Sequence, residues 1–193
     1  MHYKIIDEFC GEANKLFKHC LVGWSWDYCP EKTKGADNKY NHQMIHKLYS
    51  FQESGYSTVY TDILPIINAI DKHSQIAAFR RIKANLQMVQ PERVYSGFHH
   101  DYGIDDEGDS NMWVGIYYLN TNDGYTELED GTIINSVQDR MLFFNSKLKH
   151  RGVSQLDTKE RVVINFNFYC PSWTNPIDLM SVSYTHLTLP TKA

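Results

Sequence analysis

Four side chains in the second half of the chain have the types and the spacing of a site that binds a metal and an acid. His99 and Asp101 lie two residues apart, His150 follows later in the chain, and Arg161 comes after it. Two imidazoles and one carboxylate on one face of a β scaffold suit Fe(II) and leave coordination positions open. A nearby guanidinium can hold the carboxylate of an acidic cosubstrate.

Strand alternation predicts that His99 and Asp101 lie on the same face. Residues 93–99 have a strand-like pattern, and in a strand the side chains at positions i and i+2 share a face. His99 and Asp101 can therefore reach one ion, while His100 points away. His150 follows a strand-like run at residues 141–144 and precedes Gly152, which permits a turn or a tight approach. A lone His-x-Asp pattern arises readily by chance, so the ordered set carries the argument.

Residues 161–169 predict a strand with two different faces. Val162, Ile164, Phe166 and Phe168 form an apolar face, which belongs in the core, and Arg161 and Val163 share the other face with Asn165 and Asn167. Polar groups that face an interior need a partner there, and a ligand cavity supplies one. A surface strand with a solvated polar face is the alternative, since half-solvated antiparallel strands are common.

The other elements follow from periodicity. Apolar residues at helical spacing predict helices at residues 5–20 and 57–73, where Pro65 either kinks or starts the second helix. The alternation of Trp24 and Trp26 predicts a strand at 21–28, residues 30–41 read as a surface loop, and 44–51 predict another strand. Further strands are expected at 79–89, 93–99, 112–120, 125–128, 132–136, 140–144 and 161–169.

Two helices followed by many short strands indicate a mainly β fold with flanking helices (α+β). The best fit is a double-stranded β-helix, the cupin-like jelly roll, with the N-terminal helices packed on one sheet. At 193 residues and 42% hydrophobic content, we expect a single domain at 1–180. Residues 181–193 resemble a translated sequencing adapter, so they are excluded as a non-native tail, and the natural C-terminus is expected to be missing from about residue 181 onward.

The ordered motifs from residue 80 to 170 resemble a known family. The His-x-Asp pair precedes Tyr-Tyr-Leu-Asn at 117–120 and Asp-Gly-Tyr-Thr-Glu-Leu at 123–128, and these are followed by Arg-Met-Leu-Phe-Phe-Asn at 140–145, His150 and Arg-Val-Val-Ile at 161–164. This order resembles the prolyl 4-hydroxylase-like branch of the Fe(II)/2-oxoglutarate-dependent oxygenases. The chain is also similar to short oxygenases of this kind that bacteriophages encode, including the run Arg-Ile-Lys-Ala-Asn-Leu at 81–86.

The resemblance implies roles for particular residues. His99, Asp101 and His150 would be the Fe(II) ligands, and Arg161 would bind the distal carboxylate of 2-oxoglutarate. Tyr118 would hydrogen-bond the same carboxylate. Thr126 matches the threonine of the family's Gly-Gly-x-Thr motif, but this chain has Asp123-Gly124 where the family has two glycines.

The resemblance also implies an activity. The chain would be a dioxygenase that uses Fe(II), 2-oxoglutarate and O2 to hydroxylate a C–H bond of a substrate, and would release succinate and CO2. Its substrate would be a protein prolyl or other side chain, or a small molecule. A jelly-roll protein that binds metal or a partner without catalysis is the alternative, because a fold alone fixes no chemistry.

Composition sets limits on partners and location. The formal net charge of −4 argues against broad attraction to nucleic acid. The four cysteines, at positions 10, 20, 29 and 170, have neither CxxC nor zinc-ribbon spacing and read as reduced thiols. No signal peptide and no apolar stretch of bilayer length is recognisable, so we expect a soluble cytoplasmic protein, phage-encoded in a bacterial host.

Several other features have two interpretations. Asp105, Glu107 and Asp109 lack the glycine and glutamate of a calcium loop and are expected to be a solvated loop, which could cover the site. Trp24 and Trp26 are expected to be core residues rather than part of a substrate groove. Basic residues at 80, 81 and 83 are expected to be solvated rather than to contact an acidic substrate.

Overall fold

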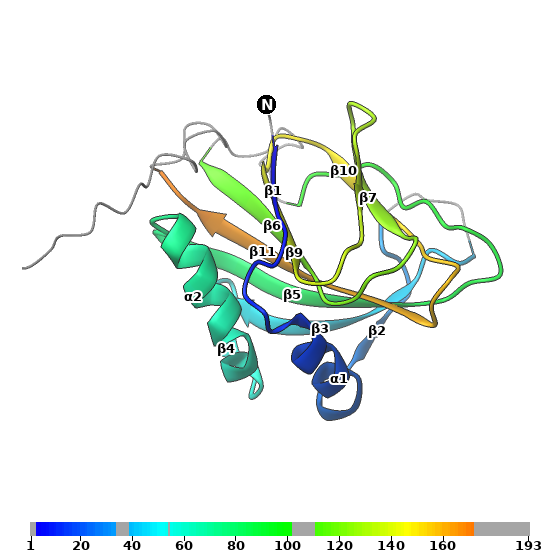
Figure 1. Cartoon of the computed structure of the whole chain (residues 1–193), viewed down its shortest axis with the longest axis horizontal. Helices are drawn as coiled ribbons and strands as arrows, with labels where there is room; N and C mark the ends of the chain where they lie inside the picture. The colour runs from blue at the N-terminus through cyan, green and yellow to red at the C-terminus, as the bar shows by residue number, and fades with distance from the viewer. Residues whose placement is uncertain (1–2, 34–38, 54, 102–110, 172–193) are drawn as a thin grey trace, which may run out of the picture.

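The computed structural model describes residues 3–33, 39–53, 55–101 and 111–171 (Figure 1). The acidic residues at 105–109 and the adapter-like tail lie outside these residues. The elements that follow are those of the described part of the chain. Among them, neither helix is long and apolar enough to cross a membrane.

A large antiparallel sheet forms the backbone of the fold. Its strands run in the order β1-β9-β6-β11-β5-β3-β2, and β4 pairs with β3. The bounds are β1 Tyr3–Ile6, β2 Asp27–Cys29, β3 Gln43–Ser50, β4 Gly55–Tyr56, β5 Ala78–Met88, β6 Met112–Tyr118, β9 Arg140–Asn145 and β11 Glu160–Tyr169. The predicted strands at 44–51, 79–89, 112–120, 140–144 and 161–169 are confirmed.

A smaller antiparallel sheet faces one side of the large sheet. It contains β10 (His150–Val153), β7 (Tyr125–Leu128) and β8 (Ile133–Asn135) in that order. Figure 1 shows β7 and β10 above the large sheet and the helices below it. Two facing antiparallel sheets with helices on the outer side form the predicted double-stranded β-helix.

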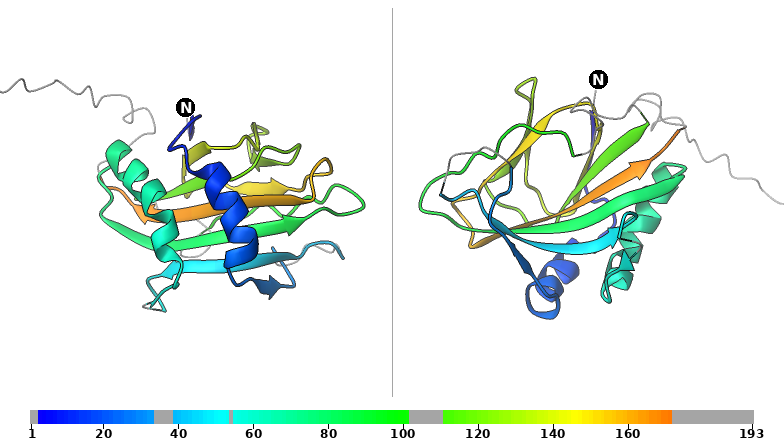
Figure 2. Two further views of the ribbon diagram at one scale, coloured as in Figure 1. Left: turned by 60° about the horizontal axis from the view of Figure 1, so that its bottom comes forward. Right: turned by 180° about the vertical axis from the view of Figure 1, so that it is seen from behind.

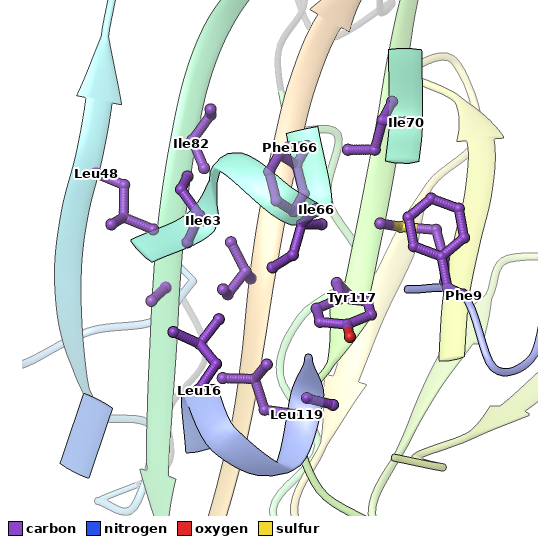
Figure 3. Packing of buried hydrophobic residues seen from close by; sticks show 14 of the residues in the cluster. Phe9, Leu16, Leu48, Ile63, Ile66, Ile70, Ile82, Tyr117, Leu119 and Phe166 are labelled. Atoms are coloured by element: carbon purple, nitrogen blue, oxygen red, sulfur yellow. The ribbon is translucent and has the colours of Figure 1, made fainter. Parts of the chain in front are cut away.

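The helices cover the outer face of the large sheet. They are α1 (Ala13–Gly23), the 3₁₀ turn η1 (Tyr60–Ile63) and α2 (Leu64–His73), and both α-helices lie across the same strands in Figure 2. Ile66 from α2 lies beside Phe166 from β11, and Leu16 from α1 lies near Leu119 (Figure 3). All four side chains belong to one buried apolar cluster. The predicted packing of the N-terminal helices on one sheet is confirmed.

Strand alternation divides β11 and β5 between the core and the space between the sheets. The even-numbered residues of both strands from 82 to 86 and from 162 to 168 belong to the apolar cluster beneath the helices. The opposite faces carry polar residues, because Arg161 pairs with Gln87, Val163 with Asn85 and Asn165 with Lys83. The predicted apolar face of residues 161–169 is therefore confirmed, and its polar face lies inside the protein rather than at the surface.

The N-terminal prediction was partly wrong. Residues 5–20 do not form one helix, because Tyr3–Ile6 pairs with β9 as an edge strand and α1 begins only at Ala13. The backbone turns between them at Gly11, which has a φ of +76°. The carboxylate of Asp139 fixes this turn by accepting hydrogen bonds from the backbone amides of Cys10 and Gly11.

Two further expected strands are corrected. The strand expected at 21–28 is replaced by the end of α1 and by β2, which has only three residues. Residues 93–99 are not a strand either. Isolated bridges from Tyr95 to Val153 and from His99 to His150 fix this segment against β10, whose four residues were not recognised as a strand.

Other expectations are confirmed. Pro65 lies in the first turn of α2, so it starts the helix rather than kinking it. Trp24 is buried in the apolar cluster and Trp26 packs against it. None of the four cysteines forms a disulfide.

Truncation of the helix–sheet contact should destabilise the whole fold. Ile66→Ala removes a fully buried side chain between α2 and the sheet, and should lower the free energy of unfolding by about 2–5 kcal/mol. Urea denaturation followed by tryptophan fluorescence measures this difference. Val22→Ala is the control, because Val22 is 88% exposed on α1. Equal stability of the two variants would contradict the packing described here.

Candidate metal and acid-binding site

A polar cavity lies between the two sheets. Its wall comes from β3, β5, β6 and β11 of the large sheet, from β7 and β10 of the small sheet, and from the segments 30–33 and 93–101. Sixteen described residues line it: Lys32, Thr33, Gln43, Lys83, Asn85, Gln87, Ser96, His99, Asp101, Ile116, Thr126, His150, Gly152, Arg161, Val163 and Asn165. The residues that the sequence singled out thus share one cavity, with the exception of Tyr118.

His99, Asp101 and His150 converge in this cavity. Their potential ligand atoms all lie within 4.8 Å of one another, and they are the one such group of three metal-ligating residues in the described part of the chain. The Nε2 atoms of His99 and His150 are 3.7 and 3.9 Å from Oδ1 of Asp101. The predicted ligand set is therefore brought together in space.

The conformation that unites His99 with Asp101 differs from the one expected. The segment that carries them is not a strand, so strand alternation does not aim their side chains. Instead, the backbone of His99 exchanges hydrogen bonds with that of His150, and the two imidazole centroids are 4.6 Å apart. His100 lies outside this group: its Nε2 is 3.1 Å from the carbonyl oxygen of Lys147, and its exclusion from the ligand set stays a prediction.

Hydrogen bonds orient the side chains of His99 and Asp101, and ring packing orients that of His150. The Nδ1–H of His99 donates to the carbonyl oxygen of Gly97 at 3.0 Å, which leaves Nε2 as the nitrogen that could bind a metal. The amide of Asn167 donates to Oδ2 of Asp101 at 2.9 Å. The ring of Phe144 packs edge-on against that of His150 with centroids 4.8 Å apart. Each ligand is thus held by a neighbour from a different strand or turn.

Burial and charge set the protonation states of His150 and Asp101. Burial lowers the pKa of His150 to about 4, so its imidazole is neutral at neutral pH. Burial alone would raise the pKa of Asp101, but the neighbouring imidazole of His99 and the charges of His150 and Arg81 hold that pKa well below the usual value. A neutral imidazole and a carboxylate are hard or borderline donors, which suit Fe(II).

Arg161 occupies the cavity end where β11 pairs with Gln87 of β5. Its side chain is buried, its Nε donates to Oγ of Ser136 at 3.0 Å, and its guanidinium lies 5.8 Å from the ring centroid of Tyr118. No carboxylate of the described residues lies within ion-pair distance of it. A buried guanidinium of this kind can bind an anion that enters the cavity.

Tyr118 and Thr126 form a buried pair beside Arg161. The hydroxyl of Tyr118 donates to Oγ1 of Thr126 at 2.7 Å. Thr126 lines the cavity, whereas Tyr118 lies behind it and is not part of the lining. A direct contact between Tyr118 and a bound acid therefore stays a prediction.

The departure from the Gly-Gly motif has a structural explanation. Asp123 accepts hydrogen bonds from the Nη2 of Arg93 at 2.6 Å and from the backbone amide of Leu156 at 2.7 Å, and so fixes the turn. Gly124 is the position that requires glycine. A Cβ there would lie 2.8 Å from Cδ of Arg161 and 2.9 Å from the backbone oxygen of Val153.

The expectation that the basic residues of β5 are solvated was wrong for two of them. Lys83 lines the cavity, and Arg81 lies 3.6 Å from Oδ1 of Asp101. β5 lies inside the sheet, between β11 and β3. Its apolar residues at 82, 84 and 86 are buried, and the polar residues that alternate with them at 81, 83 and 85 are partly buried. The same alternation that was recognised in β11 is present in β5 and could have revealed this. Lys32 was missed because the expected surface loop contributes it to the cavity.

Solved structures supply the comparison, since no family model and no curated protein matches the chain. A viral collagen prolyl hydroxylase from Paramecium bursaria Chlorella virus-1, solved with 2-oxoglutarate, aligns at 16% identity over 88% of this chain and 96% of that chain, with a TM-score of 0.54. A prolyl-4-hydroxylase from Pseudomonas putida aligns at 17% identity over 88% and 94%, with a TM-score of 0.56.

A third structure, a 2OG-Fe(II) oxygenase family oxidoreductase from Burkholderia pseudomallei, aligns at 8% identity over 87% of this chain and 85% of that chain, with a TM-score of 0.64. The chain has the fold of the 2OG-Fe(II) oxygenases. At these identities the likeness is one of fold and does not extend to the chemistry of the cavity.

Asn167 should control metal affinity although it is not a ligand. In Asn167→Ala, Asp101 loses the amide that orients it, so the affinity for Fe(II) should fall by about 10- to 100-fold. Anaerobic equilibrium dialysis with Fe(II) measures this affinity, and thermal melting shows whether the variant is folded. Asn135→Ala, at an exposed position of β8, is the control. A folded Asn167→Ala variant with unchanged affinity would contradict the orienting role.

Gly124→Ala should damage the acid-binding end of the cavity. The added Cβ would displace Arg161 or the backbone of Val153, so the affinity for 2-oxoglutarate should fall about tenfold or more as the charged hydrogen bonds of Arg161 are lost. Isothermal titration calorimetry with the Fe(II)-loaded protein under nitrogen measures it. Gly55→Ala, where the nearest atom is 3.6 Å away, should bind 2-oxoglutarate as the parent protein does. Similar affinities in the two variants would count against this placement of Arg161.

Proposed function

We propose that this protein is an Fe(II)- and 2-oxoglutarate-dependent dioxygenase that hydroxylates a C–H bond of its substrate. One atom of O2 enters the substrate and the other enters succinate, while 2-oxoglutarate loses CO2. The observation that carries the proposal is the presence of His99, Asp101, His150 and Arg161 in one buried cavity.

The proposed roles follow from position. His99, Asp101 and His150 hold Fe(II) through two nitrogens and one oxygen, and an octahedral ion then keeps three positions for the cosubstrate and O2. Arg161 receives the distal carboxylate of 2-oxoglutarate, and Thr126 lines the same end of the cavity. Tyr118 supports Thr126 through its hydroxyl. The iron supplies the oxidative chemistry, and the protein supplies position and the exclusion of water.

A protein side chain, prolyl or other, is the first candidate for the substrate. Two of the structurally similar proteins described above are prolyl hydroxylases, and they align over nearly their whole length. A small-molecule substrate is the alternative.

The location of the protein is proposed from its cysteines. None of the four forms a disulfide, which favours a reducing, cytoplasmic environment.

A metal-binding jelly-roll protein without catalysis is the second candidate function. The buried Arg161 argues against it, because an arginine without an acidic partner among the described residues is costly in a protein that binds only a metal. The enzyme gives this charge a partner in every catalytic cycle.

Spectroscopy tests the proposal in its simplest form. Anaerobic addition of Fe(II) and 2-oxoglutarate should produce a weak visible charge-transfer band, and admission of O2 should then yield succinate. His99→Ala should show no band because a ligand is lost. Arg161→Ala should need at least about tenfold more 2-oxoglutarate for the same band, since a charged hydrogen bond is lost.

His100→Ala is the matched control for His99→Ala, because His100 is the adjacent histidine and lies outside the ligand set. It should keep both the band and the formation of succinate. Absence of the band and of succinate in the unaltered protein would rule out the oxygenase and leave the non-catalytic alternative.

A further inference from the structure

A second cation lies at the same end of the cavity as Arg161. Lys32 precedes β3, and its Nζ donates to Oε1 of Gln87 at 3.0 Å. Gln87 is the residue of β5 that pairs directly with Arg161 in the sheet. Lys32 and Arg161 thus approach one point from different elements, and both line the cavity.

The backbone around Lys32 is fixed, so its position is not that of a solvated surface lysine. Its backbone amide donates to the carbonyl oxygen of Asn41 at 2.9 Å. The side-chain amide of Asn41 donates in turn to the carbonyl oxygen of Thr33 at 3.0 Å. These bonds close the described ends of the segment between β2 and β3 against each other and aim Lys32 into the cavity.

The charges of the cavity leave this cation without a counter-ion. Asp101 is the one carboxylate among the described lining residues, and it belongs to the metal end, where His99, Arg81 and Asn167 surround it. Fe(II) and Asp101 together with 2-oxoglutarate and Arg161 would already be neutral as a set, so Lys32, like Lys83 on β5, adds a positive charge to it. A further buried ammonium is costly unless it has an anionic partner. One carboxylate can be that partner for two cations, because each of its two oxygens can contact one of them.

We propose that Lys32 and Arg161 together bind the distal carboxylate of 2-oxoglutarate, and that Lys32 makes the cavity select a dicarboxylic 2-oxo acid. This inference rests on the proposed function. It assigns to the N-terminal region a part in cosubstrate recognition.

The arrangement also makes cosubstrate binding depend on pH. Burial, and then the charge of Arg161 on β11, lower the pKa of Lys32 to about 7, while Cys29 on β2 opposes this shift and Lys83 on β5 adds to it. A bound carboxylate favours the charged ammonium and raises that pKa again. Binding therefore takes up a proton. Affinity is highest below about pH 7 and falls as the pH rises towards the pKa of the complex.

Two substitutions of Lys32 separate charge from structure. Lys32→Met keeps the aliphatic chain and removes the charge. Lys32→Arg keeps a charge that does not titrate in this range. Lys15→Met is the matched control, because Lys15 is on the outer surface of α1 with its side chain 86% exposed.

The measurement is calorimetric titration of the Fe(II)-loaded proteins under nitrogen at several pH values between about 6.5 and 8.5. Two ligands are compared, 2-oxoglutarate and 2-oxopentanoate, which has the same chain length and lacks the distal carboxylate. Repeating the titration in buffers of different ionisation enthalpy counts the protons that are taken up.

Lys32→Met should weaken 2-oxoglutarate binding by about 10- to 100-fold, as for the loss of a charged hydrogen bond, and should leave 2-oxopentanoate binding unchanged. In the unaltered protein, affinity for 2-oxoglutarate should fall by up to about tenfold per pH unit above pH 7, with proton uptake. Lys32→Arg should bind without this pH dependence or uptake. Any titration of the histidine ligands is common to all variants and cancels in the comparison.

Unchanged 2-oxoglutarate affinity in Lys32→Met would overturn the inference, and so would equal weakening of both ligands, which would indicate a merely structural effect. An anion-binding Lys32 that serves the primary substrate would also appear as unchanged 2-oxoglutarate affinity. Failure of the unaltered protein to bind 2-oxoglutarate at all would instead reject the proposed function.

Discussion

β11 is hydrogen-bonded along both edges, to β5 on one side and to β6 on the other, and its residues from 161 to 168 are buried on both faces. Its even-numbered residues pack beneath the helices, and its odd-numbered residues face the space between the sheets. Polar side chains on a doubly buried strand are stable only with partners. Arg161 and Asn167 mark the two ends of this face. Arg161 has no carboxylate partner among the described residues, and Asn167 donates to the carboxylate of Asp101. The rest of the cavity is built around these two positions.

Charge compensation explains why the cavity is assembled from distant segments. Asp101 is surrounded by two histidines, an arginine from β5 and an amide from β11. A buried carboxylate with so many favourable neighbours stays ionised, which is the state that binds a divalent cation. At the opposite end of the cavity, Lys32 and Arg161 are positively charged and have no carboxylate partner among the described residues. The cavity is therefore polarised along β11 and β5, and a metal at one end and an acid at the other would complete its charge.

Much of this arrangement could be predicted from the sequence. The alternation at residues 161–169 was sufficient to separate core from cavity, and the ordered set His99, Asp101, His150 and Arg161 did converge. The reason given for His99 and Asp101 was wrong in detail, because bridges to β10 rather than a strand of their own hold that segment. Local patterns do not reveal such long-range pairing.

The errors have a common physical origin. Tyr3–Ile6 has apolar residues that fit a helix or a strand equally well, and pairing with β9 decides between them. The alternation that places Lys83 opposite the apolar face of β5 is visible in the sequence, but only the folded chain shows that this face turns into the cavity. The sequence placed Lys32 in a solvated loop. In the folded chain, hydrogen bonds from Lys32 to Asn41 and from Asn41 to Thr33 cross this loop, and a local sequence pattern does not show them.

The central claim is that this cavity couples the decarboxylation of 2-oxoglutarate to the activation of O2. Isotope labelling tests it most directly. The Fe(II)-loaded protein, supplied with 2-oxoglutarate and ¹⁸O-labelled O2, should release succinate that carries one labelled oxygen atom in its new carboxylate, detected by mass spectrometry. Succinate without the label, or no succinate beyond that formed by free Fe(II), would contradict the account.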